Sequence, residues 1–566
     1  MKKNLFRKVL CFILSVTTLF GAVGVTAAAG PLKGENSTSA TLEEMQALVD
    51  TKSYAAYKQQ YAHVVNKEGL PSISIDVLNF EGNAVIVDSS LDKFAGINNS
   101  KDPAWTEFGK ENEGISVYLP SDGSVTWQFA INDKDLAGLY NLKIVYYNCN
   151  TDESSISSIE RKLFINGKVP FSEAATLTLS KNWVYDNEEV IVHENPASTD
   201  LSDGVHTRYE REAAGKGSTG QYEKIVEHVE NGKIVKTVIY TITQDINGNS
   251  MSPEVSETCK WNTYICSDPS GYESEYLEFY IPYGSHTITL QAEREPVIIK
   301  SIEFVPAKSA EVEVPSYSEV LNDYEANGYK PATGGDFIKL EGEFPNYISD
   351  SSISSSNDNT SAATYPVVSN AQLHNVIGET SYSSIGQWAA YKFTVNQSGL
   401  YKFAMRFKQS ALQGMFICRS VKLSGGHYGT TPQLPYAEAA DAEFHYSEDW
   451  QVSYLSNREV GDFQFYFEEG VEYTIYLECA LGSLREYIQQ VETSLLNINN
   501  AYLTILKLTG SDPDQYGNYN FIGIMPEVLV SLLEEARNLT KVADDLAAIC
   551  GTNGSHLATL DRKSVV

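Results

Sequence analysis

Basic residues are scarce in this chain of 566 residues, because 42 lysines and arginines stand against 73 aspartates and glutamates. The formal net charge is −31. A surface this acidic repels phosphate backbones and gains nothing from counterion release, which argues against nucleic acid and anionic membranes as partners. Methionine is also scarce, with 6 residues, whereas tyrosine is abundant, with 35. Tyrosine suits half-buried sheets and ligand-stacking surfaces alike, since its ring is apolar and its tip polar.

The chain lacks the sequence motifs that carry catalysis. It contains no H-E-x-x-H, G-x-S-x-G or Walker pattern. The segment Gly215–Gly220 fits G-x-G-x-x-G but follows a polar loop, and Asp245–Asn249 starts like a calcium loop without its Gly and closing Glu. Carboxylates that pair only in space leave no sequence signal. From the missing motifs we expect that the protein is not an enzyme.

Cysteines are few and lie apart. The six that follow the first twenty residues show no C-x-x-C pair, which argues against a zinc site. Cys259 and Cys266 form the one close pair. Two interpretations of this pair stay open, namely a disulfide or two buried thiols.

Long apolar runs are absent except at the start. A basic segment, 2–8, precedes the apolar run Val9–Val25 and the small residues Ala27–Ala29. This order is typical of a signal peptide, which we place at 1–29, so we expect a secreted or extracellular protein associated with the cell envelope. At the other end, Asp561–Val566 matches what a common sequencing adapter encodes when it is read in frame to a stop. We therefore interpret 561–566 as a sequencing artefact and expect the natural chain to continue.

Two halves of the chain repeat each other. Trp127 and Gly138 recur as Trp388 and Gly399 at one offset (388 − 127 = 261; 399 − 138 = 261). Further pairs follow in the same order: Ser53–Tyr57 with Ser316–Val320, Val169–Ala174 with Leu434–Ala439, and Lys181–Trp183 with Glu448–Trp450. So many ordered matches indicate a duplicated module.

Each copy is predicted to be β-structure. Short segments such as Tyr276–Ile281 and Thr287–Gln291 alternate apolar and polar residues between Gly and Pro turns. The absence of a βαβ rhythm favours sandwiches. We predict a mainly β protein with two tandem jelly-roll β-sandwiches, short helical decorations and a C-terminal amphipathic helix.

The domain boundaries follow from these patterns. Asn231-Gly232 between apolar runs predicts a hairpin within an insertion, and Leu529–Leu546 carries an apolar helical stripe. After the signal peptide we expect the following units: a helical lead-in at 30–70, a first module at 71–308 with its hairpin insertion at about 206–260, a linker and short helix at 309–335, a second module at 336–510 with a helix at about 484–499 before its last strand, a linker at 511–524, and a helical region at 525–560.

The repeated segment resembles carbohydrate-binding modules of families six and thirty-five, which are galactose-binding-like jelly rolls. The resemblance rests on Ile385–Arg406, with its G-x-W-x-x-Y, G-x-Y and R positions. Leu340–Glu343 is similar to the family's opening strand, whose acids hold a structural calcium. The resemblance implies Glu341 and Glu343 as calcium ligands, although the family's late Asp has no counterpart in Ala501–Leu506.

The whole arrangement resembles the front half of extracellular solute-binding proteins of sugar-type ABC transporters. That resemblance implies a glycan or oligosaccharide ligand. It also implies an ABC-transporter permease as a partner, through a C-terminal part beyond this chain.

Family aromatics that stack on sugar give the candidate ligand residues. Trp127 and Trp388 lie inside alternating segments, so a second interpretation, that both are core residues, stays open. Trp183 and Trp450 lie instead in polar sequence. The candidate ligand-binding residues are Trp450, Trp183, Trp388, Trp127, Tyr391 and Asp449. Two alternatives to the uptake role stay open: binding modules of a truncated secreted polysaccharide-degrading enzyme, and a structural or adhesion protein.

Overall fold

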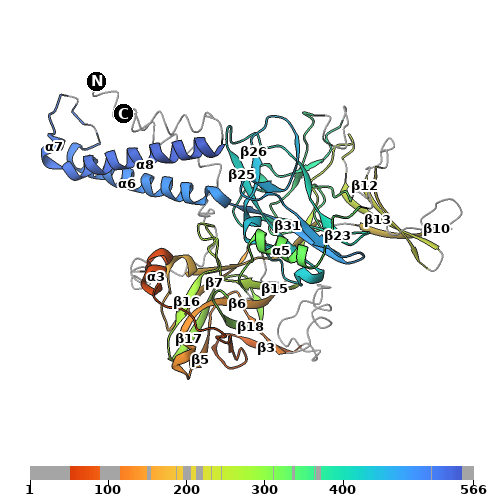
Figure 1. The fold of residues 1–566 in the computed structure, drawn as a ribbon, viewed down its shortest axis with the longest axis horizontal. Helices are drawn as coiled ribbons and strands as arrows, with labels where there is room; N and C mark the ends of the chain where they lie inside the picture. The colour runs from red at the N-terminus through yellow and green to blue at the C-terminus, as the bar shows by residue number, and fades with distance from the viewer. Residues whose placement is uncertain are drawn as a thin grey trace.

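The computed structural model describes most of residues 51–550 and is mainly β, with several antiparallel sheets and a helical C-terminal region (Figure 1). This confirms the predicted fold class. The signal peptide and the adapter-like end lie outside the described residues, as does most of the helical lead-in. Internal stretches outside them are 89–114, 150–154, 186–187, 195–205, 212–220, 231–232, 244, 310–311, 334–337, 362–363, 365–370, 512 and 515.

Module one is a two-layer sandwich. Its larger sheet has the order β15-β6-β18-β4-β3, with β1 added to β18 and β16 to β6; its other sheet has the order β2-β5-β17-β7-β8. The strands are β1 (Ile73–Ile75), β2 (Phe80–Gly82), β3 (Val85–Asp88), β4 (Ile115–Leu119), β5 (Ser124–Ile131), β6 (Gly138–Asn148), β7 (Ile159–Ile165), β8 (Thr176–Leu179), β15 (Trp261–Ile265), β16 (Glu278–Ile281), β17 (Gly284–Arg294) and β18 (Val297–Pro306).

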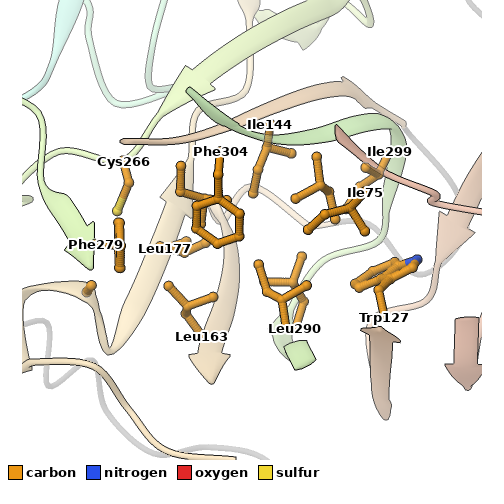
Figure 2. Close-up of a cluster of buried hydrophobic side chains, with 14 of the residues drawn as sticks. Ile75, Trp127, Ile144, Leu163, Leu177, Cys266, Phe279, Leu290, Ile299 and Phe304 are labelled. Carbon is orange, nitrogen blue, oxygen red and sulfur yellow. The ribbon is translucent and has the colours of Figure 1, made fainter. Parts of the chain in front are cut away.

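The core of module one fills the space between these sheets. Strand alternation aims one face of each strand inward: Leu163, Leu290 and Phe304 are fully buried between the layers, and Trp127 closes one side of the cluster (Figure 2). The central strand of the larger sheet is β18, which pairs with β1, β4 and β6 at once.

Module two repeats one of these sheets strand for strand. The order β19-β22-β31-β25-β26 corresponds to β2-β5-β17-β7-β8, whereas the opposite layer consists of short two-stranded pieces. The strands are β19 (Tyr347–Ile348), β20 (Ser355–Ser356), β21 (Val376–Ile377), β22 (Trp388–Thr394), β23 (Gly399–Tyr401), β24 (Ala404–Phe407), β25 (Phe416–Ser424), β26 (Ala442–His445), β27 (Gln451–Tyr454), β28 (Ser456–Asn457), β29 (Gly461–Asp462), β30 (Phe465–Phe467) and β31 (Glu472–Ala480).

The two modules share a sheet. Strand β9 (Trp183–Tyr185), which follows β8 of module one, pairs with β19 of module two, and β14 (Val255–Glu257) pairs with β9. Further contacts join the modules: Arg485 Nε donates to the carbonyl of Gly271 at 2.8 Å. The tandem sandwiches are therefore joined through β structure as well as through their linker.

An insertion separates β9 from β14 and forms a four-stranded sheet of its own, β10-β13-β12-β11, which projects from the molecule (Figure 1). It contains β10 (Glu188–Glu194), β11 (His206–Arg211), β12 (Gln221–Glu230) and β13 (Lys233–Thr243). Strands β12 and β13 pair antiparallel up to Glu230 and Lys233, at the place where the Asn-Gly pair predicts a hairpin. The inserted sheet begins with Glu188, earlier than the predicted residue 206.

A short helix leads into each module. Helix α3 (Tyr54–Tyr61) has Ser53 as its N-cap, and α5 (Tyr317–Ala326) has a capping box made by Ser316 and Glu319. Short 3-10 turns complete the modules: η1 (Lys134–Leu136), η2 (Ser172–Ala174), η3 (Glu379–Ser381), η4 (Gly426–Tyr428), η5 (Ala437–Asp441) and η6 (Gly482–Leu484).

The C-terminal region is a helical hairpin. Helix α6 (Arg485–Thr509) and helix α8 (Pro526–Cys550) lie side by side, joined through α7 (Phe521–Ile524) (Figure 1). The apolar stripe of α8 packs on α6, where Leu539 and Val542 are buried with Val491. One prediction was wrong here. The helix after β31 does not end near 499 before a last strand, because Ala501–Leu506 continues it.

Buried charges fix the turn between β17 and β18. The ammonium of Lys181 lies 3.0 Å from Glu257 and 2.8 Å from Glu295, and all three side chains are at most 3% exposed. Arg161, fully buried, donates to the carbonyls of Arg294 and Glu295. Buried charges need such partners, because an unpaired ion in the interior is costly.

None of the helices in the described part of the chain is long and apolar enough to cross a membrane. Cys259 and Cys266 are both buried, and no disulfide joins them.

Candidate functional site

The outer face of the ribbon formed by β24 and β27 brings aromatic and polar side chains together. The register opposes Phe407 to Gln451 and Ala404 to Tyr454. Met405 and Phe407 pack on the core, so their neighbours in sequence project outward. The outward set is Ala404 and Arg406 of β24 with the flanking Lys402 and Lys408, and Val452 and Tyr454 of β27 with the flanking Trp450.

Trp450 is held at its polar edge by a loop carboxylate. Its indole Nε1 donates to Oδ2 of Asp358 at 3.1 Å, and the ammonium of Lys408 lies 3.3 Å from the same oxygen. The other oxygen of Asp358 accepts the backbone N–H of Thr360 at 2.7 Å. Burial opposes ionisation of Asp358, but the hydrogen bonds from Thr360, Trp450 and Lys408 outweigh it and lower its pKa. This carboxylate therefore orients the indole.

The rest of the face is open to solvent. Trp450 is half-buried and belongs to none of the core clusters, whereas Val452 is 65% exposed and Tyr454 48% exposed. The ammonium of Lys402 lies 5.1 Å from the centre of the Tyr454 ring. Asp449 is exposed beside Trp450. Trp450 and Tyr454 stand four residues apart on one face, about 13 Å along a strand.

The counterpart of this face in module one is built by a residue that the sequence analysis missed. Strand β15 pairs with β6 as β27 pairs with β24, which places Trp261 opposite Tyr147 and makes it the counterpart of Trp450. The repeated segments in the sequence match Trp183 to Trp450 instead. The insertion lies between Trp183 and Trp261, so Trp261 falls outside the matched segment. The alternating stretch Trp261–Ile265 directly after the insertion was the available signal. A loop of module two contacts this face, since Thr431 donates to Thr263 at 3.4 Å.

Trp127 is a core residue, which corrects its assignment as a ligand contact. Its side chain is 0% exposed, and its Nε1 donates to the carbonyl of Val77 at 2.9 Å. Its counterpart in module two is Tyr391, also buried, whose hydroxyl donates to the carbonyl of Gly342 at 2.8 Å. Tyr391 is therefore a packing residue as well.

Trp388 does not correspond to Trp127 in space, despite the constant sequence offset. Ala389, Tyr391 and Phe393 point into the core, so Trp388 points to the other side of β22, where its ring meets Tyr476 edge-on at 5.1 Å. That side lies opposite to the layer of β24 and β27. The structure thus does not bring Trp388 and Trp450 together.

Trp183 is buried at the junction of the modules, which corrects its assignment to a ligand site. It is 6% exposed, pairs with Ile348 of module two, and lies in the core cluster of that module. Its polar sequence context reflects the neighbouring buried Lys181 rather than solvent.

The two candidate calcium ligands are buried side by side. Glu341 and Glu343 are 8% and 2% exposed; Glu341 forms an ion pair with Lys339, and Oε1 of Glu343 has no hydrogen-bond partner among the described residues. Burial and the charge of Glu341 raise the pKa of Glu343 to about 8. Such carboxylates suit a hard cation that takes oxygen ligands. The part of the chain that the structure describes holds no group of three His, Cys, Asp or Glu placed to bind a metal, so a cation here needs further oxygen ligands.

A crevice of about 180 Å³ separates helix α3 from strands β6 and β16 and is lined by Tyr54, Tyr57 and Tyr61. It is smaller than the roughly 300–1,000 Å³ of typical ligand pockets. The hydroxyls of Tyr54 and Tyr57 accept backbone N–H groups of β16. We interpret it as the seam where the helix docks.

Comparisons with known proteins give no family. No family model matches the chain, and no curated protein matches it. Among solved structures, it is similar to the catalytic domain of GH87 alpha-1,3-glucanase in complex with nigerose, at 10% identity, 46% coverage of this chain and a TM-score of 0.20. A D1068A variant of that domain in complex with tetrasaccharides matches at 11% identity, 45% coverage and 0.19. The chain spans about a third of the length of those glucanase chains (34% and 32%). Similarity this low carries no argument about function.

Proposed function

We propose that this protein is a secreted, non-catalytic carbohydrate-binding protein whose glycan site is the outer face of β24 and β27. The observation that carries the proposal is the placement of Trp450: outside the core, held by its Nε1 through Asp358, and on one face with the exposed Tyr454. The apolar side of a sugar ring stacks on such rings, and its hydroxyls bond to neighbouring polar groups.

The polar groups around the rings suit a hydroxyl-rich ligand. Asp449 is exposed beside Trp450 and offers carboxylate acceptors. Arg406 adds guanidinium donors on the same face. Among the described residues, module two presents this arrangement openly, whereas the Trp261 face of module one meets Thr431. We therefore assign the proposed glycan site to module two.

The proposal includes a role in sugar uptake. The two-module arrangement after an export signal resembles the front half of a solute-binding protein, so capture of an extracellular glycan would serve transport through an ABC-transporter permease. It also includes a structural calcium at Glu341 and Glu343, whose burial as a pair favours a bound cation.

A glycan array probed with the purified chain tests the proposal, followed by calorimetry on each glycan that binds. We expect dissociation constants between micromolar and millimolar, about −4 to −8 kcal/mol, because orientation losses offset most of the stacking energy. The same glycans incubated with the protein should release no new reducing ends. Retention of no glycan on a broad array would contradict binding, and release of reducing ends would contradict the non-catalytic assignment.

A further inference from the structure

Among the described residues, module two has no counterpart of the strand that completes module one. In module one, β17 is followed after Glu295 and Pro296 by β18, which lies between β6 on one side and β1 and β4 on the other. In module two, β31 is followed by η6 and then α6, and no described residue after β31 returns to the sheet. The helix therefore begins where the equivalent of β18 would begin.

The neighbours of the missing strand are less covered than their counterparts. In module one, the inward residues of β6 are at most 3% exposed, namely Tyr140, Leu142, Ile144 and Tyr146. In module two, the residues at the same offset of 261 are all half-buried: Tyr401, Phe403, Met405 and Phe407.

The opening segment shows the same difference. Ile75 in β1 is 5% exposed and pairs with β18. In module two, the corresponding Leu340 is half-buried, Ile338 is 37% exposed, and neither belongs to a strand. A sandwich with an open strand position exposes backbone edges and apolar side chains that favour pairing.

The helical hairpin brings the chain back to this position. Leu484, at the start of α6, and Leu546, near the end of α8, share one cluster with Phe416 and Cys418 of β25. The hairpin thus leaves module two and returns to it at the same end. In module two, the hairpin follows β31 at the point where module one has the two-residue connection between β17 and β18.

We propose that the open position beside β24 is filled by a β-strand of this protein's own chain that follows α8. The strand has the pattern of Val297–Pro306, where Val297, Ile299, Ile302 and Phe304 reach the core. It completes module two as β18 completes module one, which makes module two a discontinuous domain interrupted by the hairpin. This surface is distinct from the outward face that carries Trp450.

A tethered strand tests the proposal. The ten residues of Val297–Pro306 are attached after Cys550 through a flexible Gly-Ser linker, in place of 551–566, and a matched chain carries the same ten residues in scrambled order. Amide hydrogen exchange is measured at Ala404–Phe407 and at Ile338–Leu340. We expect exchange there to slow at least tenfold with the native-order strand and to stay unchanged with the scrambled one, with a higher melting temperature only for the former.

Two results overturn the proposal. If amides of Ala404–Phe407 already exchange as slowly as those of Leu142–Tyr146 in the untethered protein at any concentration, the position is already filled. If their protection instead rises with protein concentration and the tethered strand adds nothing, a second copy of the chain fills it.

Discussion

The carboxylate of Glu173 accepts the backbone N–H of Tyr54, 119 residues earlier, at 2.7 Å. Module two repeats this contact, since Glu438 accepts the N–H of Tyr317 at 2.9 Å. Both glutamates lie at the start of a helix that leads into the module, where a negative charge also meets the positive end of the helix dipole. The lead-in helix and the segment that carries the glutamate lie far apart in the sequence but contact each other in both modules. This contact explains why both segments are repeated.

Replacing this carboxylate should destabilise module one. In Glu173→Ala, the first turn of α3 loses a charged acceptor, and we expect a loss of about 0.5–2 kcal/mol. Urea denaturation followed by tyrosine and tryptophan fluorescence measures it. Glu68→Ala, at an exposed position, serves as the control and should change stability by less than about 0.5 kcal/mol. Equal effects of the two variants would contradict the capping role.

Trp127→Ala should cost stability and leave glycan binding intact. The change leaves a cavity in the core and removes the donor to Val77, so we expect a loss of about 3–5 kcal/mol. Trp127→Phe keeps most of the volume and should cost less. Denaturation curves for both variants, with a glycan titration of the folded protein, check this. A stable Trp127→Ala variant with weakened binding would restore Trp127 as a ligand contact.

Removing the positive charge of Lys181 should strongly lower the stability of module one. Lys181→Met leaves Glu257 and Glu295 buried without it, and we expect a loss of about 3–5 kcal/mol. Lys162→Met is the matched control, because Lys162 pairs with Glu293 at a partly exposed site, where a pair contributes about 1 kcal/mol or less. Similar losses in both variants would contradict a special role for the buried cluster.

Module two should lose stability as the pH rises from about 4.5 to about 8 in a chelator. Glu343 has a folded pKa of about 8, above its ordinary value, so the folded state holds this proton more tightly than the unfolded state. The contribution is present below pH 4.5 and is lost as the folded carboxyl ionises. Melting curves in EDTA across this range should show the fall, Glu343→Gln should flatten it, and added calcium should restore stability at pH 8. A Glu343→Gln variant with an unchanged pH profile would contradict this assignment.

The sequence predicts much of the fold because its signals are local. Alternation predicted the strands, and the Asn-Gly pair predicted the hairpin whose strands β12 and β13 pair up to Glu230 and Lys233. Strand β9 could not be placed in the sheet of module two, because pairing between distant strands leaves no mark in either segment. The apolar residues of Ala501–Leu506 fit a strand or a helix equally, so the sequence pattern does not distinguish the two. In the structure they continue the helix that begins at Arg485.

The candidate site was predicted less well, because a shift in strand register reverses the face of every side chain. Trp127 and Trp388 match in sequence, yet their strands align with Trp127 at Tyr391, so one tryptophan points inward and the other outward. An insertion between Trp183 and Trp261 likewise moved the true counterpart of Trp450 out of the matched segment. Asp358, which holds Trp450, lies 92 residues away in a loop that no motif marks.

A comparison of Trp450→Ala with the unaltered chain tests the central claim most directly, by calorimetric titration with a bound glycan and a thermal melt of each protein. Covering about 100 Å² of the ring corresponds to roughly 2.5 kcal/mol at ~25 cal/mol/Å² before losses. We predict that the dissociation constant rises tenfold or more while the melting temperature barely changes, since Trp450 lies outside the core. Unchanged binding together with a large drop in melting temperature would contradict the account and make Trp450 a packing residue.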